Sequence, residues 1–219
     1  MLITKKGQGW SMEDFSKIGY IIDMVNGFVY EGAMHDDYIA HTIDEQIKLI
    51  KTLKEEKQGV ALIGEWHDKD CAEFITYPAH CVKGTSEAEF VEGIKEFEND
   101  SLVYKKNSTN GIFAPGLLDD LNKMKNLKEV VIGGCCTDIC VLHFVLSLKT
   151  YFNQTNRDVK VFVVESATET YNAPNHNRVE YNELAYKLMK QNGVYVVKDL
   201  KELKEKENAL GLNLNRRSR

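Results

Sequence analysis

Residues 128–154, KEVVIGGCCTDICVLHFVLSLKTYFNQ, join a short apolar run to a segment of helical periodicity through a turn that holds three cysteines. The run KEVVIGG is rich in valine and isoleucine, as strands buried on both faces are. From Asp138 onward the apolar residues recur at helical spacing, and Thr137 or Asp138 is placed to cap the first turn. The stretch therefore predicts a strand, a sharp turn and a helix, with the thiols at the turn.

The same alternation of strand and helix extends along the chain. Five further short apolar runs predict strands at 17–23, 59–66, 101–106, 159–166 and 193–199. Two further segments of helical periodicity cover 36–58 and 176–193. In the first of them four apolar residues mark one helix face, namely Ile43, Ile47, Ile50 and Leu53. A glycine, Gly59 or Gly193, ends each segment.

Connections of this length join parallel strands, because an antiparallel pair needs only a tight turn. We therefore expect an α/β fold, a three-layer open sheet of about six mostly parallel strands with helices on both faces. No linker or internal repeat divides the chain, so residues 1–219 are predicted to form a single domain. The polar tail, 205–219, is predicted to fray.

Composition excludes several classes of protein. The 219 residues are 43% hydrophobic, enough for one sizeable core, and the net charge of -5 gives no reason to expect nucleic acid or an anionic membrane as partner. No stretch approaches the roughly 20 apolar residues of a membrane helix, and the first residues lack the apolar run of a signal peptide. Five cysteines, an odd number, favour reduced thiols and a cytoplasmic location over a disulfide framework.

Reactive side chains follow four of the predicted strands. Asp23 ends the first strand, Glu65 and His67 follow the second, Lys106 ends the third, and the cysteine cluster follows the fourth. In open parallel sheets ligands bind beyond the carboxyl ends of the strands, so these groups are expected to meet at one edge. Each has an ordinary alternative as well; Asp23, for instance, could simply begin a loop or cap a helix.

Glu65 and His67 lie two residues apart, so on an extended strand both side chains point to the same side. A carboxylate oxygen and an imidazole nitrogen at that spacing suit Zn²⁺, Fe²⁺ or Mn²⁺. Glu73 and His80 could complete such a site from the following loop. Taken alone the pattern is weak, because surface histidines and solvated glutamates explain it equally well.

Among the cysteines, position favours Cys140 as a reactive thiol. It lies just inside the predicted helix, where backbone N–H groups and the helix dipole favour a thiolate, and a nearby lysine would favour it further. Cys135 and Cys136 lie in the turn itself. The alternative for any single cysteine is a small buried hydrophobe.

Three segments, in this order, resemble the isochorismatase-like cysteine hydrolases and, within them, the nicotinamidase branch. IIDMVNGFV (21–29) resembles the family's first-strand motif, an Asp followed five residues later by Phe. YPAHCVKGT (77–85) is similar to the nicotinamidase signature, and GGCCTDICV (133–141) is similar to the family's nucleophile turn. The resemblance implies the isochorismatase-like hydrolase fold. It also implies hydrolysis of nicotinamide to nicotinic acid and ammonia, through a cysteine thioester, in NAD salvage.

The resemblance also implies catalytic roles. Cys140 would be the nucleophile, Asp23 the general base and Lys106 the third member of the triad. Lys105 is adjacent, and strand alternation lets only one of the two lysines face the site. The peptide bond before Cys136 would be cis, and the N–H groups of Cys136 and Cys140 would form an oxyanion hole.

The resemblance further implies a metal site, a substrate pocket and partners. One divalent transition metal, with zinc expected and manganese or iron as alternatives, would be bound by Glu65, His67, Glu73 and His80. The substrate would be contacted by Phe28, Tyr77 and Cys135. The expected partners are a small-molecule substrate and further copies of the chain, with no nucleic acid and no membrane.

The chain departs from the family pattern at several positions. The first metal ligand is usually Asp and is Glu65 here, Val25 replaces a Gln, Cys136 replaces an Ala, and residues 110–112 read Asn-Gly-Ile where Ser-Ala-Phe is usual. Two other functions therefore remain open. One is another amide or ureido hydrolase in which the metal-site residues serve polar recognition. The other is a non-catalytic thiol or binding protein on the same fold.

Overall fold

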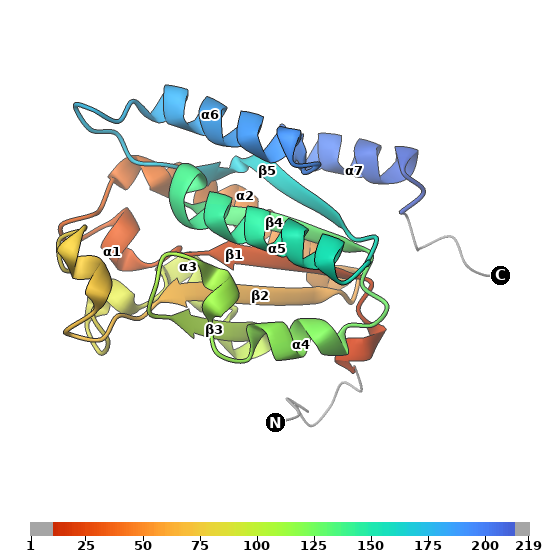
Figure 1. The fold of residues 1–219 in the computed structure, drawn as a ribbon, viewed down its shortest axis with the longest axis horizontal. Helices are drawn as coiled ribbons and strands as arrows, with labels where there is room; N and C mark the ends of the chain where they lie inside the picture. The colour runs from red at the N-terminus through yellow and green to blue at the C-terminus, as the bar shows by residue number, and fades with distance from the viewer. Residues whose placement is uncertain (1–10, 213–219) are drawn as a thin grey trace.

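The computed structural model describes residues 11–212, and within them six parallel strands form one open sheet (Figure 1). The strands are β1 (Lys17–Ile22), β2 (Gly59–Glu65), β3 (Leu102–Lys106), β4 (Glu129–Cys135), β5 (Lys160–Glu169) and β6 (Tyr195–Val197). Their order is β3-β2-β1-β4-β5-β6. The direction of winding therefore reverses between β1 and β4, the place where open α/β sheets form a crevice for ligands.

Helices cover both faces of the sheet, which confirms the predicted three-layer architecture (Figure 1). One face packs against α4 (Leu117–Lys123), α5 (Leu142–Gln154) and α6 (Arg178–Gln191). The other face packs against α1 (Asn26–Val29), α2 (Ile43–Glu55), α3 (Glu92–Lys95) and α7 (Leu200–Ala209). Single helical turns in the loops are Met12–Asp14, Asp37–Thr42, Ala72–Ile75, Ser86–Ala88, Glu98–Asp100, Gly111–Phe113 and Thr137–Val141.

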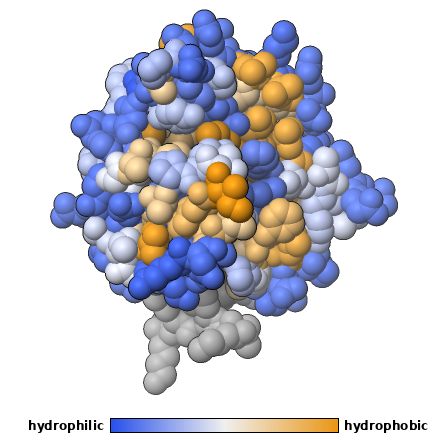
Figure 2. Space-filling model, turned by 60° about the vertical axis from the view of Figure 1, so that its left-hand side comes forward, coloured by the Kyte–Doolittle hydropathy of each residue, from blue (hydrophilic) through white to orange (hydrophobic). Residues whose placement is uncertain are grey.

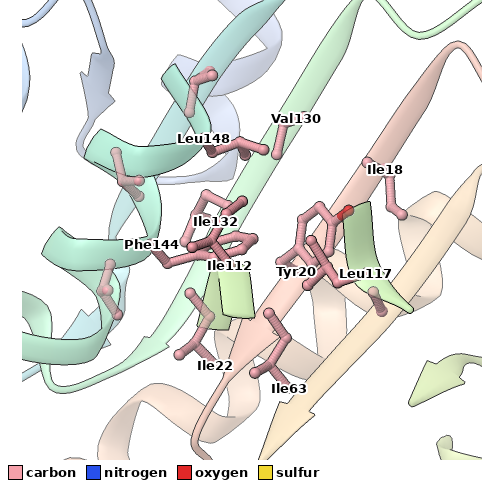
Figure 3. Packing of buried hydrophobic residues seen from close by; sticks show 14 of the residues in the cluster. Ile18, Tyr20, Ile22, Ile63, Ile112, Leu117, Val130, Ile132, Phe144 and Leu148 are labelled. Carbon is pink, nitrogen blue, oxygen red and sulfur yellow. The ribbon is translucent and has the colours of Figure 1, made fainter. Parts of the chain in front are cut away.

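Alternate residues of each strand point into two clusters of buried hydrophobic residues, one on each face of the sheet. On β1, Tyr20 and Ile22 point toward α4 and α5, whereas Ile21 joins the opposite cluster with α2. Figure 3 shows the first cluster, in which the ring of Tyr20 meets that of Phe144 edge to face at 5.1 Å between centroids. Each fully buried side chain of this size stabilises the fold by about 1.5–3 kcal/mol. The sheet thus lies between two hydrophobic clusters, one under each helix layer.

Two glycines let backbones approach closely. A Cβ on Gly19 would lie 2.3 Å from Leu53 Cδ1, so glycine here lets α2 pack directly on β1. Gly134 has a φ of 125°, and a Cβ on it would lie 2.1 Å from Ile22 O. The carboxyl ends of β1 and β4 can therefore lie side by side only because residue 134 has no side chain.

Helix boundaries differ from the predicted ones at the ends. The segment predicted as one helix over 36–58 is a 3-10 turn at Asp37–Thr42 followed by α2. Strand β5 was expected to end at 166 but continues to Glu169, with a register shift in its pairing between Ile132 and Gly134 of β4. None of the described helices combines the length and apolar character needed to cross a membrane.

The tail 205–219 was predicted to fray, but its first part, residues 205–209, belongs to α7. Glu207 is buried, and its carboxylate pairs with Lys17 at 2.8 Å. Lys17 also lies 3.1 Å from Glu56 and 3.6 Å from Glu129. This charge cluster ties α7 to the amino end of the sheet, which the polar sequence of the tail does not reveal. Residues 213–219 of the predicted tail lie outside the described residues.

Candidate active site

The carboxyl ends of β1, β2 and β3 and the turn after β4 bring four buried reactive groups together. Lys106 Nζ lies 2.8 Å from Asp23 Oδ2 and 2.7 Å from Glu65 Oε1. Cys140 Sγ lies within 4.8 Å of a carboxylate oxygen of Asp23 and of Glu65. The groups that the sequence placed after separate strands therefore meet at one point, as the rule for open sheets predicts.

Strand alternation separates the two adjacent lysines. Lys106 is 1% exposed and points into the cluster. Lys105 points the other way, with its Nζ 4.1 Å from the ring centroid of Phe90 and 4.9 Å from that of Trp66. The structure thus brings Lys106 to Asp23 and places Lys105 against aromatic rings.

Burial and the Lys106 charge together set the acid–base properties of the cluster. Burial raises the pKa of Asp23 to about 7, although Lys106 lowers it. Burial also raises the pKa of the Cys140 thiol well above its usual value, and the nearby ammonium offsets this only in part. For Glu65 burial acts in the same direction, but Lys106 and the two histidines outweigh it and hold the pKa of that carboxyl low. Asp23 is therefore the carboxyl that can exchange a proton near neutral pH.

The turn after β4 places Cys140 at the beginning of a helix. The Cys135–Cys136 peptide bond is cis, and the N–H groups of Ile139 and Val141 both donate to Cys136 O at 3.1 Å. Thr137–Val141 forms a π-helical turn that leads directly into α5. Cys140 therefore lies at the positive end of the α5 dipole, which favours a negative charge on its sulfur. The oxyanion role of the Cys136 and Cys140 N–H groups stays a prediction.

Two of the four predicted metal ligands, His67 and His80, lie against one carboxylate oxygen of a third, Glu65. Glu65 Oε2 lies 3.0 Å from His67 Nε2 and 2.9 Å from His80 Nε2, and all three side chains are buried. The fourth, Glu73, has its Oε2 3.7 Å from His67 Nε2. Two imidazoles with carboxylate oxygens suit a divalent transition metal.

The hydrogen bonds of His80 test whether these residues fit a metal ion. Its Nδ1 lies 2.8 Å from Pro78 O, and a carbonyl only accepts, so Nδ1 carries a proton. In the neutral ring Nε2 then presents a lone pair to the Glu65 carboxylate, and two acceptors that face each other need a proton or a cation between them. Burial lowers the pKa of His80, but Glu65 outweighs it and raises that pKa. A metal ion would satisfy both acceptors, so the residues fit the implied metal.

Glu73 is oriented by a residue that the sequence did not single out. Its Oε1 accepts hydrogen bonds from the backbone N–H and the hydroxyl of Thr109, the second at 2.7 Å. These bonds leave the other oxygen, Oε2, facing the imidazole of His67. No motif marks Thr109, and only its place in the loop after Lys106 could have suggested it.

A pocket opens above Cys140. It is lined by Phe28, Met34, Glu65, Glu73, Tyr77, His80, Thr109, Cys136, Ile139, Cys140 and Tyr171. Figure 2 brings this end of the molecule forward and shows apolar residues gathered in the middle of the face among hydrophilic ones. Aromatic walls with a few convergent polar groups are typical of sites for small molecules.

The pocket contains two of the three predicted substrate contacts. Phe28 and Tyr77 both line it, with ring centroids 5.5 Å and 6.3 Å from that of His80. Cys135 is not among the lining residues; it is fully buried, and its thiol donates to Asp23 O at 3.1 Å. Tyr171 lines it unexpectedly. The sequence did not single out this residue, which lies in the loop after β5.

Comparison with known proteins identifies the family. Residues 20–199 match the model of the isochorismatase domain, which is most of the chain. The chain belongs to the isochorismatase family. Membership agrees with the resemblance seen in the three sequence motifs, and the six-stranded sheet is the family's fold.

The proteins to which this chain is similar have different activities. The chain is 34% identical over 145 residues to nicotinamidase 1 of Arabidopsis thaliana, and the match covers 59% of each protein. A pyrazinamidase of Pyrococcus horikoshii in complex with zinc has a TM-score of 0.67 at 23% identity, over 84% of this chain and 99% of that one. N-carbamoylsarcosine amidase from Thermoplasma acidophilum has a TM-score of 0.69 at 22% identity, over 84% and 96%. These two structures establish the shared fold.

Proposed function

We propose that this protein is a metal-dependent nicotinamidase, which hydrolyses nicotinamide to nicotinic acid and ammonia in NAD salvage. The observation that carries the proposal is the Lys106 ammonium held between Asp23 and Glu65 beside the Cys140 sulfur. The aromatic pocket above this cluster and the 34% identity to a plant nicotinamidase support the choice of substrate.

The first half-reaction forms a thioester. Asp23 takes the proton of the Cys140 thiol, and the sulfur attacks the carboxamide carbon. The N–H groups of Cys136 and Cys140 stabilise the oxyanion, and one such donor contributes typically about 3–4 kcal/mol. The C–N bond then breaks, and Asp23 returns the proton to the leaving ammonia.

The second half-reaction consumes water. Asp23, ionised again, takes a proton from a water molecule that attacks the thioester carbon. The C–S bond breaks, nicotinic acid leaves, and Asp23 returns the proton to the Cys140 sulfur. Lys106 keeps Asp23 in place through both steps and balances its charge. A pKa near 7 for Asp23 lets the same carboxyl act as base and as acid.

Glu65, His67, Glu73 and His80 would hold the metal, with zinc as the expected ion and manganese or iron as alternatives. When bound, the ion supplies positive charge that can orient the substrate or lower the pKa of a water molecule. Phe28 and Tyr77 would lie on either side of the pyridine ring.

All five cysteines are free and buried, which supports work in a reducing compartment, and we place the protein in the cytoplasm. Self-association into a homo-oligomer stays a prediction from the family resemblance.

A second candidate is a metal-independent amide or ureido hydrolase. The ion pair between Glu65 and Lys106 favours it, because this carboxylate is already neutralised by a protein group. In that case Glu65, His67 and His80 would recognise a polar substrate directly. Retained metal and a preference for pyridine carboxamides over ureido compounds distinguish the first candidate from the second.

The experiment is ammonia release from nicotinamide by intact protein, by Cys140→Ala and by protein treated with a chelator. We expect release by the intact protein alone, and recovery of the treated sample when zinc is restored. Release that survives the chelator would support the second candidate. No release from intact, zinc-loaded protein would overturn the nicotinamidase assignment.

A further inference from the structure

The loop between β5 and α6 carries a histidine that contacts two different walls of the pocket. His176 is buried, and its Nε2 lies 2.8 Å from Asp138 Oδ2 in the turn that holds Cys140. Its Nδ1 lies 3.0 Å from Tyr171 O. The loop is closed on itself by two backbone hydrogen bonds of 3.0 Å between Ala173 and His176.

The ring of His176 lies between two tyrosine rings. Its centroid is 3.9 Å from that of Tyr171, with an angle of 5° between the planes, and 3.7 Å from that of Tyr181. A flat ring has only two faces, so each tyrosine covers one of them. The two nitrogen atoms of His176 lie against oxygen atoms of different segments, Asp138 Oδ2 and Tyr171 O, so the stacked ring is held at both edges as well as on both faces.

The loop is anchored at a second place. Asp36 Oδ2 accepts hydrogen bonds from Asn172 N–H at 2.8 Å and from the Arg178 guanidinium. The Arg178 guanidinium in turn lies over the ring of Tyr38, 3.9 Å from its centroid. The segment that carries Tyr171 is thus tied on both sides, to residues before α2 and to the nucleophile turn.

We propose that Tyr171 is a specificity-determining wall of the pocket for a flat aromatic ring, and that His176 is the positioning residue that fixes this wall against the nucleophile turn. The inference deepens the proposed function and rests on it. Tyr171 lines the same pocket as Phe28 and Tyr77. Because Asp138 lies two residues before Cys140, the His176–Asp138 contact sets the distance between the aromatic wall and the sulfur.

The test compares two reagents that alkylate Cys140, iodoacetamide and 3-(bromoacetyl)pyridine. In both reactions the sulfur forms a bond to the CH₂ carbon and a halide ion leaves, and mass spectrometry locates the product. The pyridine reagent gains from an ordered aromatic pocket, whereas iodoacetamide reports only on the thiol. Their rate ratio therefore separates a role of the wall from a general loss of structure. KM and kcat for nicotinamide are measured beside it.

Four variants are used. Tyr171→Ala removes the wall, His176→Phe keeps a flat ring between the tyrosines but loses both hydrogen bonds, and Asp138→Ala removes the same contact from the other side. His143→Phe is the matched control, because His143 is exposed and its Nδ1 also faces a backbone carbonyl of the turn, Ile139 O at 2.8 Å.

We expect the rate ratio to fall about fivefold to tenfold in the first three variants, with a matching rise in KM for nicotinamide, and to stay unchanged in the control. An unchanged rate ratio in Tyr171→Ala would overturn the role of Tyr171 as a wall of the pocket. A loss in Tyr171→Ala with native ratios in both His176→Phe and Asp138→Ala would overturn the positioning role. If intact protein releases no ammonia from nicotinamide, the proposed function fails, and the rate ratios still decide this inference separately.

Discussion

Glu65 and Lys106 form a buried ion pair in which only one oxygen of the carboxylate, Oε1, takes part, at 2.7 Å. The other oxygen, Oε2, faces the two histidines of the candidate metal site. One side chain therefore contacts both the histidines of the candidate metal site and the lysine of the buried cluster around Cys140. An aspartate at this position would be one methylene shorter, so we expect it to make only one of the two contacts.

Two substitutions of Glu65 separate its contacts. Glu65→Gln keeps the shape but loses the charge, and we expect metal affinity to fall by at least about tenfold. Glu65→Asp keeps a carboxylate for the histidines but is too short to reach Lys106 as well, so metal should be retained while the melting temperature falls. Metal content after dialysis and thermal unfolding measure the two effects. Equal metal content in Glu65→Gln and intact protein would contradict the ligand role.

The two lysines of β3 provide a matched pair. Lys106→Met leaves Asp23 and Glu65 buried without their cation, and loss of one partner of a buried pair costs about 3–5 kcal/mol. Lys105→Met loses mainly contacts with the rings of Phe90 and Trp66, worth about 0.5–1 kcal/mol. Urea unfolding gives both values, and ammonia release should vanish only in the first variant. Activity in Lys106→Met with loss in Lys105→Met would reverse the assignment.

The aromatic walls make a graded prediction. Tyr77→Phe keeps the ring and should leave hydrolysis of nicotinamide nearly unchanged. Tyr77→Ala removes the ring, and we expect KM to rise about threefold to tenfold with little change in kcat, since a ring contact contributes about 0.5–1.5 kcal/mol. Steady-state kinetics decide this. A large loss in Tyr77→Phe would show instead that the hydroxyl is what matters.

The buried cluster at the amino end of the sheet predicts a pH effect on stability. Burial, with the neighbouring Glu207, raises the pKa of Glu129 from 4.5 to about 9. Because the folded pKa is the higher one, this group contributes stability below its ordinary pKa, and the contribution is lost as pH rises through about 9. Glu129→Gln cannot titrate, so its melting temperature should decline less than that of intact protein between about pH 6 and about pH 9.

Glu56 supplies the control for this prediction. Burial raises its pKa, but Lys204 and Lys17 outweigh that and hold the pKa below 4.5. Its contribution to stability is present above its ordinary pKa and is lost only as pH falls. Glu56→Gln should therefore shift the melting temperature by the same amount at both ends of that range. Parallel pH curves for Glu129→Gln and intact protein would rule out the raised pKa.

The sequence predicted the sheet and much of the site because both depend on short-range patterns. Apolar runs located the strands, and the residue at each strand end, such as Asp23 or Lys106, had to lie at the common edge. Lys105 shows the limit of that logic, since alternation required one lysine to face the site but did not say which. The structure decides it, because the Lys106 ammonium reaches Asp23.

The contacts that the sequence missed come from loops and long-range packing. Thr109 orients Glu73, and Tyr171 closes the pocket, yet neither belongs to a periodic segment or a motif. Helix α7 was missed because its few apolar residues, such as Leu203, stand among many charged ones, and its buried Glu207 is paired with a distant partner, Lys17. Such contacts are set by tertiary structure, which local propensity does not encode.

The spacing between Asp23 and Cys140 depends on the absence of a side chain at Gly134. Since a Cβ on residue 134 would lie 2.1 Å from Ile22 O, a side chain there would push β4, which leads into the turn of Cys140, away from β1, which ends just before Asp23. In a library that randomises residue 134, only the clones that keep glycine there should be active. For anyone redesigning the pocket, Gly134 has to be kept together with Cys140, because no change elsewhere in the turn restores the backbone spacing that glycine allows.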